Sequence, residues 1–179
     1  MEVNNPNTPL YAYASNLRLT LKAWPAVAGA TIGLCYLTQT VARWFGVELP
    51  DQENVDIIRR YAGWNLAFAL LVAQVVVVMP VMEEALFRWL MFRLPAGRLA
   101  AKCGASVAAA GAALLSSAAF SAAHYIRQPW PDAAFVALFF FGLAQCWLYR
   151  RTERLWSPML NHALFNLTNL VLLFVIPEG

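Results

Sequence analysis

The sequence is organised around residues 75–92, which read VVVVMPVMEEALFRWLMF. Two adjacent carboxylates, Glu83 and Glu84, and the guanidinium of Arg88 lie inside one of the most apolar stretches of the chain. Ionisable side chains at membrane depth are costly, so they usually face the interior of a helix bundle and serve a function. The simpler alternative is that the acidic pair marks the end of a span, where lipid headgroups solvate it.

The composition indicates a membrane protein. Of the 179 residues, 60% are hydrophobic and only 13% are charged, whereas roughly 25% of the residues in a soluble domain are charged. Several apolar runs approach the ~20 residues that a helix needs to span a bilayer. The net charge of +3 does not point to nucleic acid as a partner, because the basic residues lie in short loops where they set the orientation in the membrane.

The expected fold class is all-α, a polytopic bundle of about five transmembrane helices. Residues 1–22 form an N-terminal tail in this interpretation, and residues 23–179 form the bundle. The expected spans cover about residues 23–41, 61–94, 104–125, 132–149 and 157–176. The Ala, Gly and Ser residues of the third span predict close approach to a neighbouring helix.

The second expected span is the longest. Pro80 lies inside it and is expected to kink one continuous helix, since proline removes a helical hydrogen bond. Pro95 and Gly97 are expected to end that helix. Before this span, residues 46–60 predict a turn and then a short surface helix.

The loops predict the orientation of the bundle. A cytoplasmic N-terminus places most of the basic residues on the cytoplasmic side, namely Arg18, Lys22, Arg93, Arg98, Lys102, Arg150, Arg151 and Arg154. The basic residues left outside are Arg43, Arg59, Arg60 and Arg127. This arrangement satisfies the excess of Lys and Arg in cytoplasmic loops. We therefore expect a multi-pass membrane protein with its N-terminus in the cytoplasm.

Helix geometry separates the two glutamates. Glu84 and Arg88 are spaced i, i+4, so they can form an ion pair on one helix face. Neither charge has water as an alternative partner inside a membrane, so this pair should be well defined. Glu83 points about 100° away from Glu84. We predict that Glu83 is the reactive carboxylate and that the ion pair is its scaffold.

Both histidines of the chain also lie in apolar segments. His124 follows Phe120 by four residues and His162 precedes Asn166 by four, so each pair shares one helix face. A single buried histidine is more often a satisfied core residue. Two histidines and a carboxylate pair inside the membrane together indicate one shared functional site. Further polar residues expected to form hydrogen bonds between helices are Gln145, Asn161 and Asn169.

Three motifs resemble those of the CAAX protease and bacteriocin-processing family, also called the Abi family, which includes the type II CAAX prenyl endopeptidases. They are Glu-Glu-x-x-x-Arg at 83–88, Phe-x-x-x-His at 120–124 and His-x-x-x-Asn at 162–166. The resemblance covers about residues 64–175. The chain is shorter than eukaryotic members and shows about five spans in place of eight, so it looks like a minimal bacterial member. That likeness implies a bacterial inner (plasma) membrane, and the substrate class does not carry over.

The resemblance implies an intramembrane endopeptidase that needs no cofactor. In that family reading, Glu83 is the general base that activates water, and His124 helps to hold the water. His162 and Asn166 donate hydrogen bonds to the oxyanion that forms when water attacks the peptide carbonyl. The supporting residues are Glu84, Arg88 and Phe120. The expected partners are membrane lipid and a membrane-associated peptide or protein.

Three alternatives stay open at this point. The first is a zinc metalloprotease, because one carboxylate and two histidines also make a zinc site; its ligands would be Glu83, His124 and His162. The second is a non-catalytic scaffold or bacteriocin-immunity protein of the same fold. The third is a transporter that relays protons through these side chains. Five spans without an inverted repeat speak against a transporter.

The depths of the candidate residues agree only in part. At ~1.5 Å per residue, Glu83 lies roughly 16 Å from a helix end at Leu94, and Asn166 lies roughly 13 Å along the last span. His124 instead lies roughly 30 Å along a span that begins near Gly104. Either a strong tilt or a later start of the third span would reconcile the two depths.

Overall fold

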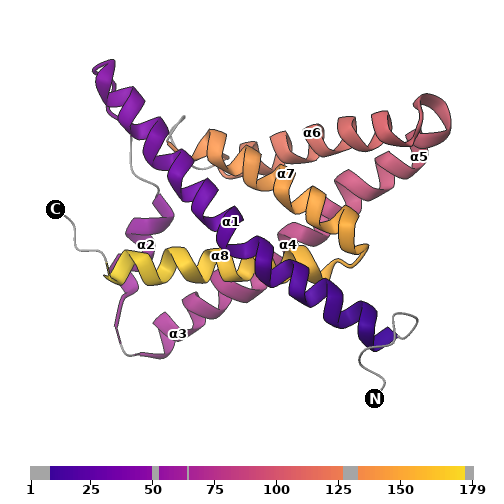
Figure 1. Ribbon diagram of the computed structural model, residues 1–179. Coiled ribbons are helices and arrows are strands. Elements are labelled where there is room, and N and C mark those ends of the chain that lie inside the picture. The colour runs from indigo at the N-terminus through magenta and orange to yellow at the C-terminus, as the bar shows by residue number, and fades with distance from the viewer. Residues whose placement is uncertain (1–8, 50–52, 64, 127–132, 176–179) are drawn as a thin grey trace.

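The structure is a computed structural model that describes residues 9–49, 53–63, 65–126 and 133–175. All the regular structure in these residues is helical (Figure 1), which confirms the expected all-α class. The helices are α1 (Pro9–Trp44), α2 (Glu53–Tyr61), α3 (Leu66–Ala73), η1 (Gln74–Val78), α4 (Met79–Glu84), η2 (Ala85–Arg93), α5 (Leu94–Cys103), α6 (Ala105–Ala123), α7 (Ala134–Thr152) and α8 (Trp156–Val175). The segments η1 and η2 have π geometry, in which backbone hydrogen bonds join residues i and i+5.

The segments from α3 to α5 form one long helix that crosses the direction of α1 obliquely in Figure 1. Helix α6 packs against η2 and α5 on one side and against α7 on the other. Helix α8 packs against α1, α7, η1 and α4. These contacts bring the middle of the long helix, the end of α6 and the first half of α8 together.

Three helices among the described residues are long and apolar enough to cross a membrane. They are Leu66–Cys103, Ala105–Ala123 and Trp156–Val175. The other two expected spans are also helices: α1 packs against α7 and α8, and α7 packs against α6, α8 and η2. Helix α1 begins at Pro9, so it includes much of the N-terminal tail expected at residues 1–22. The last turn of α7 carries Arg150 and Arg151, which make that helix less apolar. The short surface helix expected within residues 46–60 is α2.

The long helix corrects one expectation, because Pro95 and Gly97 do not end it. The helix continues through both residues to Cys103 and ends at Gly104, whose φ of 85° favours glycine. Pro80 and Pro95 each stand at the first or second position of an α segment that follows a π segment. The helix thus continues through both prolines, although each lacks a backbone N–H for the preceding turn.

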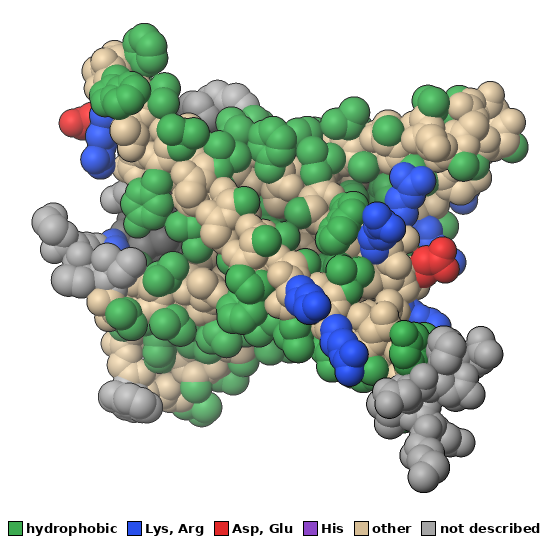
Figure 2. All heavy atoms as spheres, in the orientation of Figure 1, with side chains coloured by type: hydrophobic (Ala, Val, Ile, Leu, Met, Phe, Trp, Pro, Cys, Tyr) green, Lys and Arg blue, Asp and Glu red, His purple; other side chains and the backbone are tan. Residues whose placement is uncertain are grey.

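Basic side chains gather on one side of the molecule in Figure 2, over the first half of α1 and beside the end of α7. The first half of α1 carries Arg18 and Lys22, and the last turn of α7 carries Arg150 and Arg151. The opposite end of α1 carries Arg43. This distribution follows the separation expected from the sequence, and the side that faces the cytoplasm stays a prediction.

Helices α6 and α7 approach each other closely at Gly142. A Cβ atom at Gly142 would lie 2.9 Å from Ser117 Cβ and 3.0 Å from Ser117 Cα. Gly142→Ala is therefore expected to push the two helices apart and to lower the free energy of unfolding by about 1–3 kcal/mol. Thermal unfolding of the purified protein in detergent measures this loss.

Gly111→Ala is the matched control for this prediction. It lies on α6, and a Cβ atom there meets nothing within 4 Å. Alanine also has the higher helix propensity, so this variant should unfold at or slightly above the temperature of the native protein. Equal unfolding temperatures for the Gly142 and Gly111 variants would contradict the close packing of α6 on α7.

Candidate active site

The centre of the site is a fully buried ion pair on the long helix. Arg88 Nη2 donates a hydrogen bond of 3.3 Å to Glu84 Oε1. Arg88 Nε lies 2.8 Å from Glu84 Oε2, and both side chains are 0% exposed. Arg88 Nη1 donates to Ser116 Oγ on α6, which donates in turn to the carbonyl of Phe87. The predicted i, i+4 pair is therefore confirmed, and it is fixed to a second helix.

His162 of α8 joins the two glutamates. Its Nδ1 lies 3.0 Å from Glu84 Oε1, and its Nε2 lies 3.7 Å from Glu83 Oε2. A carboxylate paired with Arg88 can only accept hydrogen bonds, so Nδ1 is the donor to Glu84. This assignment places the proton on Nδ1 and directs Nε2 toward Glu83. Four charged or polar groups thus form one chain from Arg88 through Glu84 and His162 to Glu83.

Glu83 differs from Glu84 in its surroundings. Its side chain is 18% exposed, whereas that of Glu84 is 0% exposed. The 3.7 Å contact to His162 Nε2 is too long for a direct hydrogen bond. A small polar molecule can bridge two groups at such a separation. The unpaired carboxylate predicted from helix geometry therefore lies where it can share such a molecule with His162.

The ring of Phe120 connects His124 to the rest of the site. Phe120 is 0% exposed, and its ring centroid lies 4.8 Å from that of His124 and 5.8 Å from that of His162. The guanidinium of Arg88 lies 5.0 Å from the same ring, within the range of a cation–π contact. His124 Nδ1 hydrogen-bonds the Phe120 carbonyl at 2.8 Å. His124 therefore belongs to the same cluster and contacts it through Phe120.

The length of the long helix resolves the depth of His124. Twenty residues separate Glu83 from Cys103, and twenty separate Gly104 from His124. At ~1.5 Å per residue both side chains lie about 30 Å from the turn that joins α5 to α6. The rings of Phe87 and Phe120, whose centroids are 5.3 Å apart, also pair at matching distances from this turn. Neither a strong tilt nor a later start of the third span is needed.

Asn166 lies against the long helix but contacts a backbone carbonyl. Its Nδ2 donates to the carbonyl of Val75 at 2.8 Å. In the π segment the backbone donor for Val75 would be residue 80, and Pro80 has no N–H. The N–H of Met79 donates to Gln74 instead. Asn166 therefore supplies the hydrogen bond that Pro80 cannot make, and one of its two amide N–H groups is used for this.

This arrangement makes Asn166 and Pro80 energetically coupled. Asn166→Ala leaves the Val75 carbonyl without a donor, which is expected to lower the free energy of unfolding by about 1–3 kcal/mol. The same substitution should cost much less in a Pro80→Ala background, because alanine restores a backbone donor. Denaturant unfolding of the four proteins of this cycle in detergent measures the coupling. A cost that is equal in both backgrounds would contradict it.

Asn169→Ala provides the control for the loss of an amide from α8. Asn169 Nδ2 donates to the carbonyl of Phe165 in its own helix, so the expectation of an inter-helix bond is wrong for this residue.

The other two residues expected to link helices do so. Gln145 Nε2 donates to Asn161 Oδ1 at 2.9 Å, and Asn161 Nδ2 donates to the carbonyl of Thr20 in α1 at 3.4 Å.

The zinc alternative requires the side chains of Glu83, His124 and His162 to converge on one point. Among the described residues there is no group of three or more His, Cys, Asp or Glu side chains that could hold a metal ion. His162 Nδ1 is bonded to Glu84, and His124 Nδ1 is bonded to the Phe120 carbonyl. These bonds leave the Nε2 atom of each ring for a ligand, and the zinc alternative of Glu83, His124 and His162 stays a prediction.

A family model described as "Type II CAAX prenyl endopeptidase Rce1-like" matches residues 64–168. The match runs from the residues before α3 into the second half of α8 and includes all seven candidate site residues. Helices α1 and α2 lie outside it. No curated protein and no solved structure matches the chain.

Proposed function

The chain belongs to the Rce1-like family of type II CAAX prenyl endopeptidases, and on that premise we propose that it is an intramembrane endopeptidase. In this proposal it hydrolyses peptide bonds of membrane-associated proteins or peptides with water that Glu83 activates. The observation that carries the proposal is the position of His162, whose two nitrogens face Glu84 and Glu83. Three apolar helices and the family make the chain an integral membrane protein.

The geometry supports a general-base mechanism. A water between Glu83 Oε2 and His162 Nε2 donates one proton to each group, since both atoms are acceptors when the imidazole is neutral. Glu83 takes one of these protons as the water oxygen attacks the peptide carbonyl. The proton then passes to the leaving nitrogen as the C–N bond breaks, which yields a carboxylic acid and an amine and regenerates the Glu83 carboxylate.

The other site residues position these groups. Glu84, held by its ion pair with Arg88, accepts a hydrogen bond from His162 Nδ1–H and thereby holds the imidazole with Nε2 toward Glu83. In this mechanism His162 holds the water, which is the role that the resemblance gave to His124. His162 does not donate to the oxyanion, as the resemblance implied, because its one N–H is bonded to Glu84. Asn166 keeps one amide N–H for the oxyanion, because the other is bonded to Val75. His124 supports the cluster through Phe120.

A survey of protein N-termini in membranes tests the proposal even while the substrate is unidentified. It compares cells that carry the native protein, the Glu83→Gln variant or the Glu48→Gln control. Glu48 is an exposed carboxylate outside the site. Neo-termini that depend on Glu83 but not on Glu48 support proteolysis and name the substrate. Identical profiles of N-termini in all three strains would contradict proteolysis. If the two variants also keep a phenotype of the native strain that a deletion strain loses, the protein is a non-catalytic scaffold.

Two further parts of the proposal have direct tests. The first test is the metal content of the purified protein. Stoichiometric zinc, together with recovery of activity when zinc is added back after its removal, would overturn the metal-free mechanism. We also propose a cytoplasmic N-terminus, because the basic parts of α1 and α7 lie on the same side of the molecule (Figure 2). The bacterial inner membrane is proposed from the likeness to a minimal bacterial member of the family. Topology reporters fused before α1 and in the turn after α1 test this orientation. If the reporter before α1 is found on the outer side of the membrane, the orientation is the reverse of the one proposed.

A further inference from the structure

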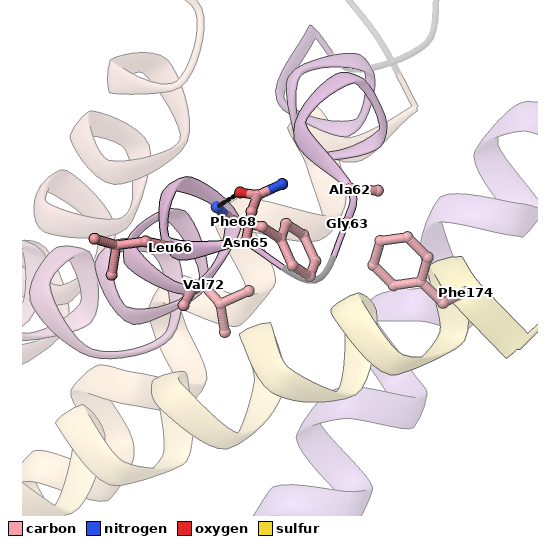
Figure 3. A pocket seen from close by; sticks show the side chains of 8 residues that line it. Ala62, Gly63, Asn65, Leu66, Phe68, Val72 and Phe174 are labelled. Carbon is pink, nitrogen blue, oxygen red and sulfur yellow. Dashed lines mark hydrogen bonds between the residues drawn. The ribbon is translucent and has the colours of Figure 1, made fainter.

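A groove lies where the long helix begins and α8 ends (Figure 3). Its volume is about 910 Å³, which is within the range of ligand pockets of roughly 300–1,000 Å³. The lining residues are Ala62, Gly63, Asn65, Leu66, Phe68, Ala69, Val72 and Phe174. None of the candidate catalytic residues lines it, so the groove is separate from the site described above.

The walls of the groove are apolar. The rings of Phe68 and Phe174 pack edge to face in its wall, with a centroid distance of 5.8 Å and an interplanar angle of 90°. Asn65 is the one polar side chain among the described residues of the lining. Its Oδ1 accepts a hydrogen bond of 2.9 Å from the N–H of Phe68 and so caps α3, as the dashed line in Figure 3 shows. The groove therefore suits an apolar chain.

The groove lies at the ends of two helices that are long and apolar enough to cross a membrane. Its walls come from the first turns of one membrane-spanning helix and the last turns of another. Leu66 and Leu70 on the same helix are 74% and 61% exposed, as expected for side chains that face lipid. Lipid acyl chains are thus the apolar molecules present at highest concentration around this part of the protein.

A basic residue lies close to the groove in the sequence. Arg60 is exposed and belongs to the last turn of α2, two residues before the lining residue Ala62. A Lys or Arg close to a membrane surface that contains anionic lipid attracts that lipid with about 1 kcal/mol. The sequence therefore places an anion-binding group beside an apolar groove, which matches the two parts of an anionic phospholipid.

We propose that this groove binds one anionic phospholipid. One acyl chain lies along Phe68, Val72 and Phe174, and the phosphate contacts Arg60. The groove shares the seam between the long helix and α8 that also contains the hydrogen bond of Asn166 to Val75. The bound lipid would therefore stabilise the pair of helices that carries the proposed catalytic groups, and the proposal holds whether or not the protein is a protease.

Native mass spectrometry of the purified full chain in detergent tests the proposal, with phosphatidylglycerol and phosphatidylcholine of identical acyl chains as probes. The native protein is expected to bind one phosphatidylglycerol in a saturable manner. Ala69→Trp fills the groove and should weaken this binding at least about tenfold. Arg60→Gln should weaken binding of phosphatidylglycerol roughly fivefold and leave binding of phosphatidylcholine unchanged.

Two matched controls separate these effects from general changes. Leu70→Trp adds the same side chain at the next position, which does not line the groove. Arg43→Gln removes a basic residue from the last turn of α1. Both controls should bind phosphatidylglycerol as the native protein does. If Ala69→Trp does not fold, Val72→Phe serves as the second groove-filling variant, and thermal unfolding in detergent confirms the fold of each.

Three results would overturn the proposal. Unchanged binding of phosphatidylglycerol by both groove-filling variants would exclude the groove as its site. Equal affinities for the two lipids in the native protein and in Arg60→Gln would exclude recognition of the anionic headgroup. Unchanged lipid binding with a raised KM for substrate cleavage in Ala69→Trp would make the groove part of the substrate site instead.

Discussion

Glu83→Gln is expected to lower kcat for cleavage of a substrate peptide by roughly 10²–10⁴-fold, with little change in KM. The amide keeps the shape of the side chain but cannot take a proton from water. The substitution should change the free energy of unfolding by only about 0.5 kcal/mol. Glu83 is partly exposed, and its contact to His162 is 3.7 Å long, so few interactions that stabilise the fold depend on its charge.

The measurement combines steady-state cleavage with thermal unfolding of the same preparation. The peptide spans a cleavage site that the survey of N-termini identifies. Glu48→Gln, an exposed carboxylate away from the site, controls for the loss of one charge and should retain the native kcat. Retained cleavage by Glu83→Gln would exclude Glu83 as the base. A fall in unfolding temperature that parallels the fall in kcat would show that the carboxylate acts on the fold.

Much of the fold follows from local patterns in the sequence. The apolar runs and their breaks place α6, α7 and α8 close to their observed positions, because each lies between clear turn residues. The predicted end of the long helix was wrong because Pro95 and Gly97 are only local signals. Helix α5 packs along α6, and this tertiary contact supports helical structure beyond both residues. The sequence contains no sign of that contact before the chain is folded.

One part of the candidate site could also be predicted from local spacing, and another part depends on how the helices pack. The Glu84–Arg88 pair could be predicted because i, i+4 spacing alone brings the two side chains together. The contacts of His162 to both glutamates depend on how α8 packs against α4, which no spacing within one helix encodes. The bond from Asn166 to Val75 was also missed. Its one available signal was Pro80, whose missing N–H requires a substitute donor somewhere in the fold.

The second large effect is expected at the buried ion pair. Arg88→Met leaves the Glu84 carboxylate fully buried with His162 as its remaining partner, and Glu84→Leu leaves the Arg88 guanidinium buried. Removing one partner of a buried pair typically costs about 3–5 kcal/mol, because the other charge loses its compensation. Each single variant should therefore unfold at a much lower temperature than the native protein. Circular dichroism of the detergent-solubilised variants measures this loss.

The double variant Glu84→Leu/Arg88→Met separates the role of the pair in stability from its role in catalysis. Replacing both charges with apolar side chains removes the uncompensated charge, so most of the lost stability should return. Cleavage should not return, because His162 Nδ1 has lost its acceptor and the imidazole is no longer held with Nε2 toward Glu83. A double variant as unstable as the single ones would show that Ser116 and Phe120 also depend on the guanidinium. A double variant with native kcat would contradict the positioning of His162 by Glu84.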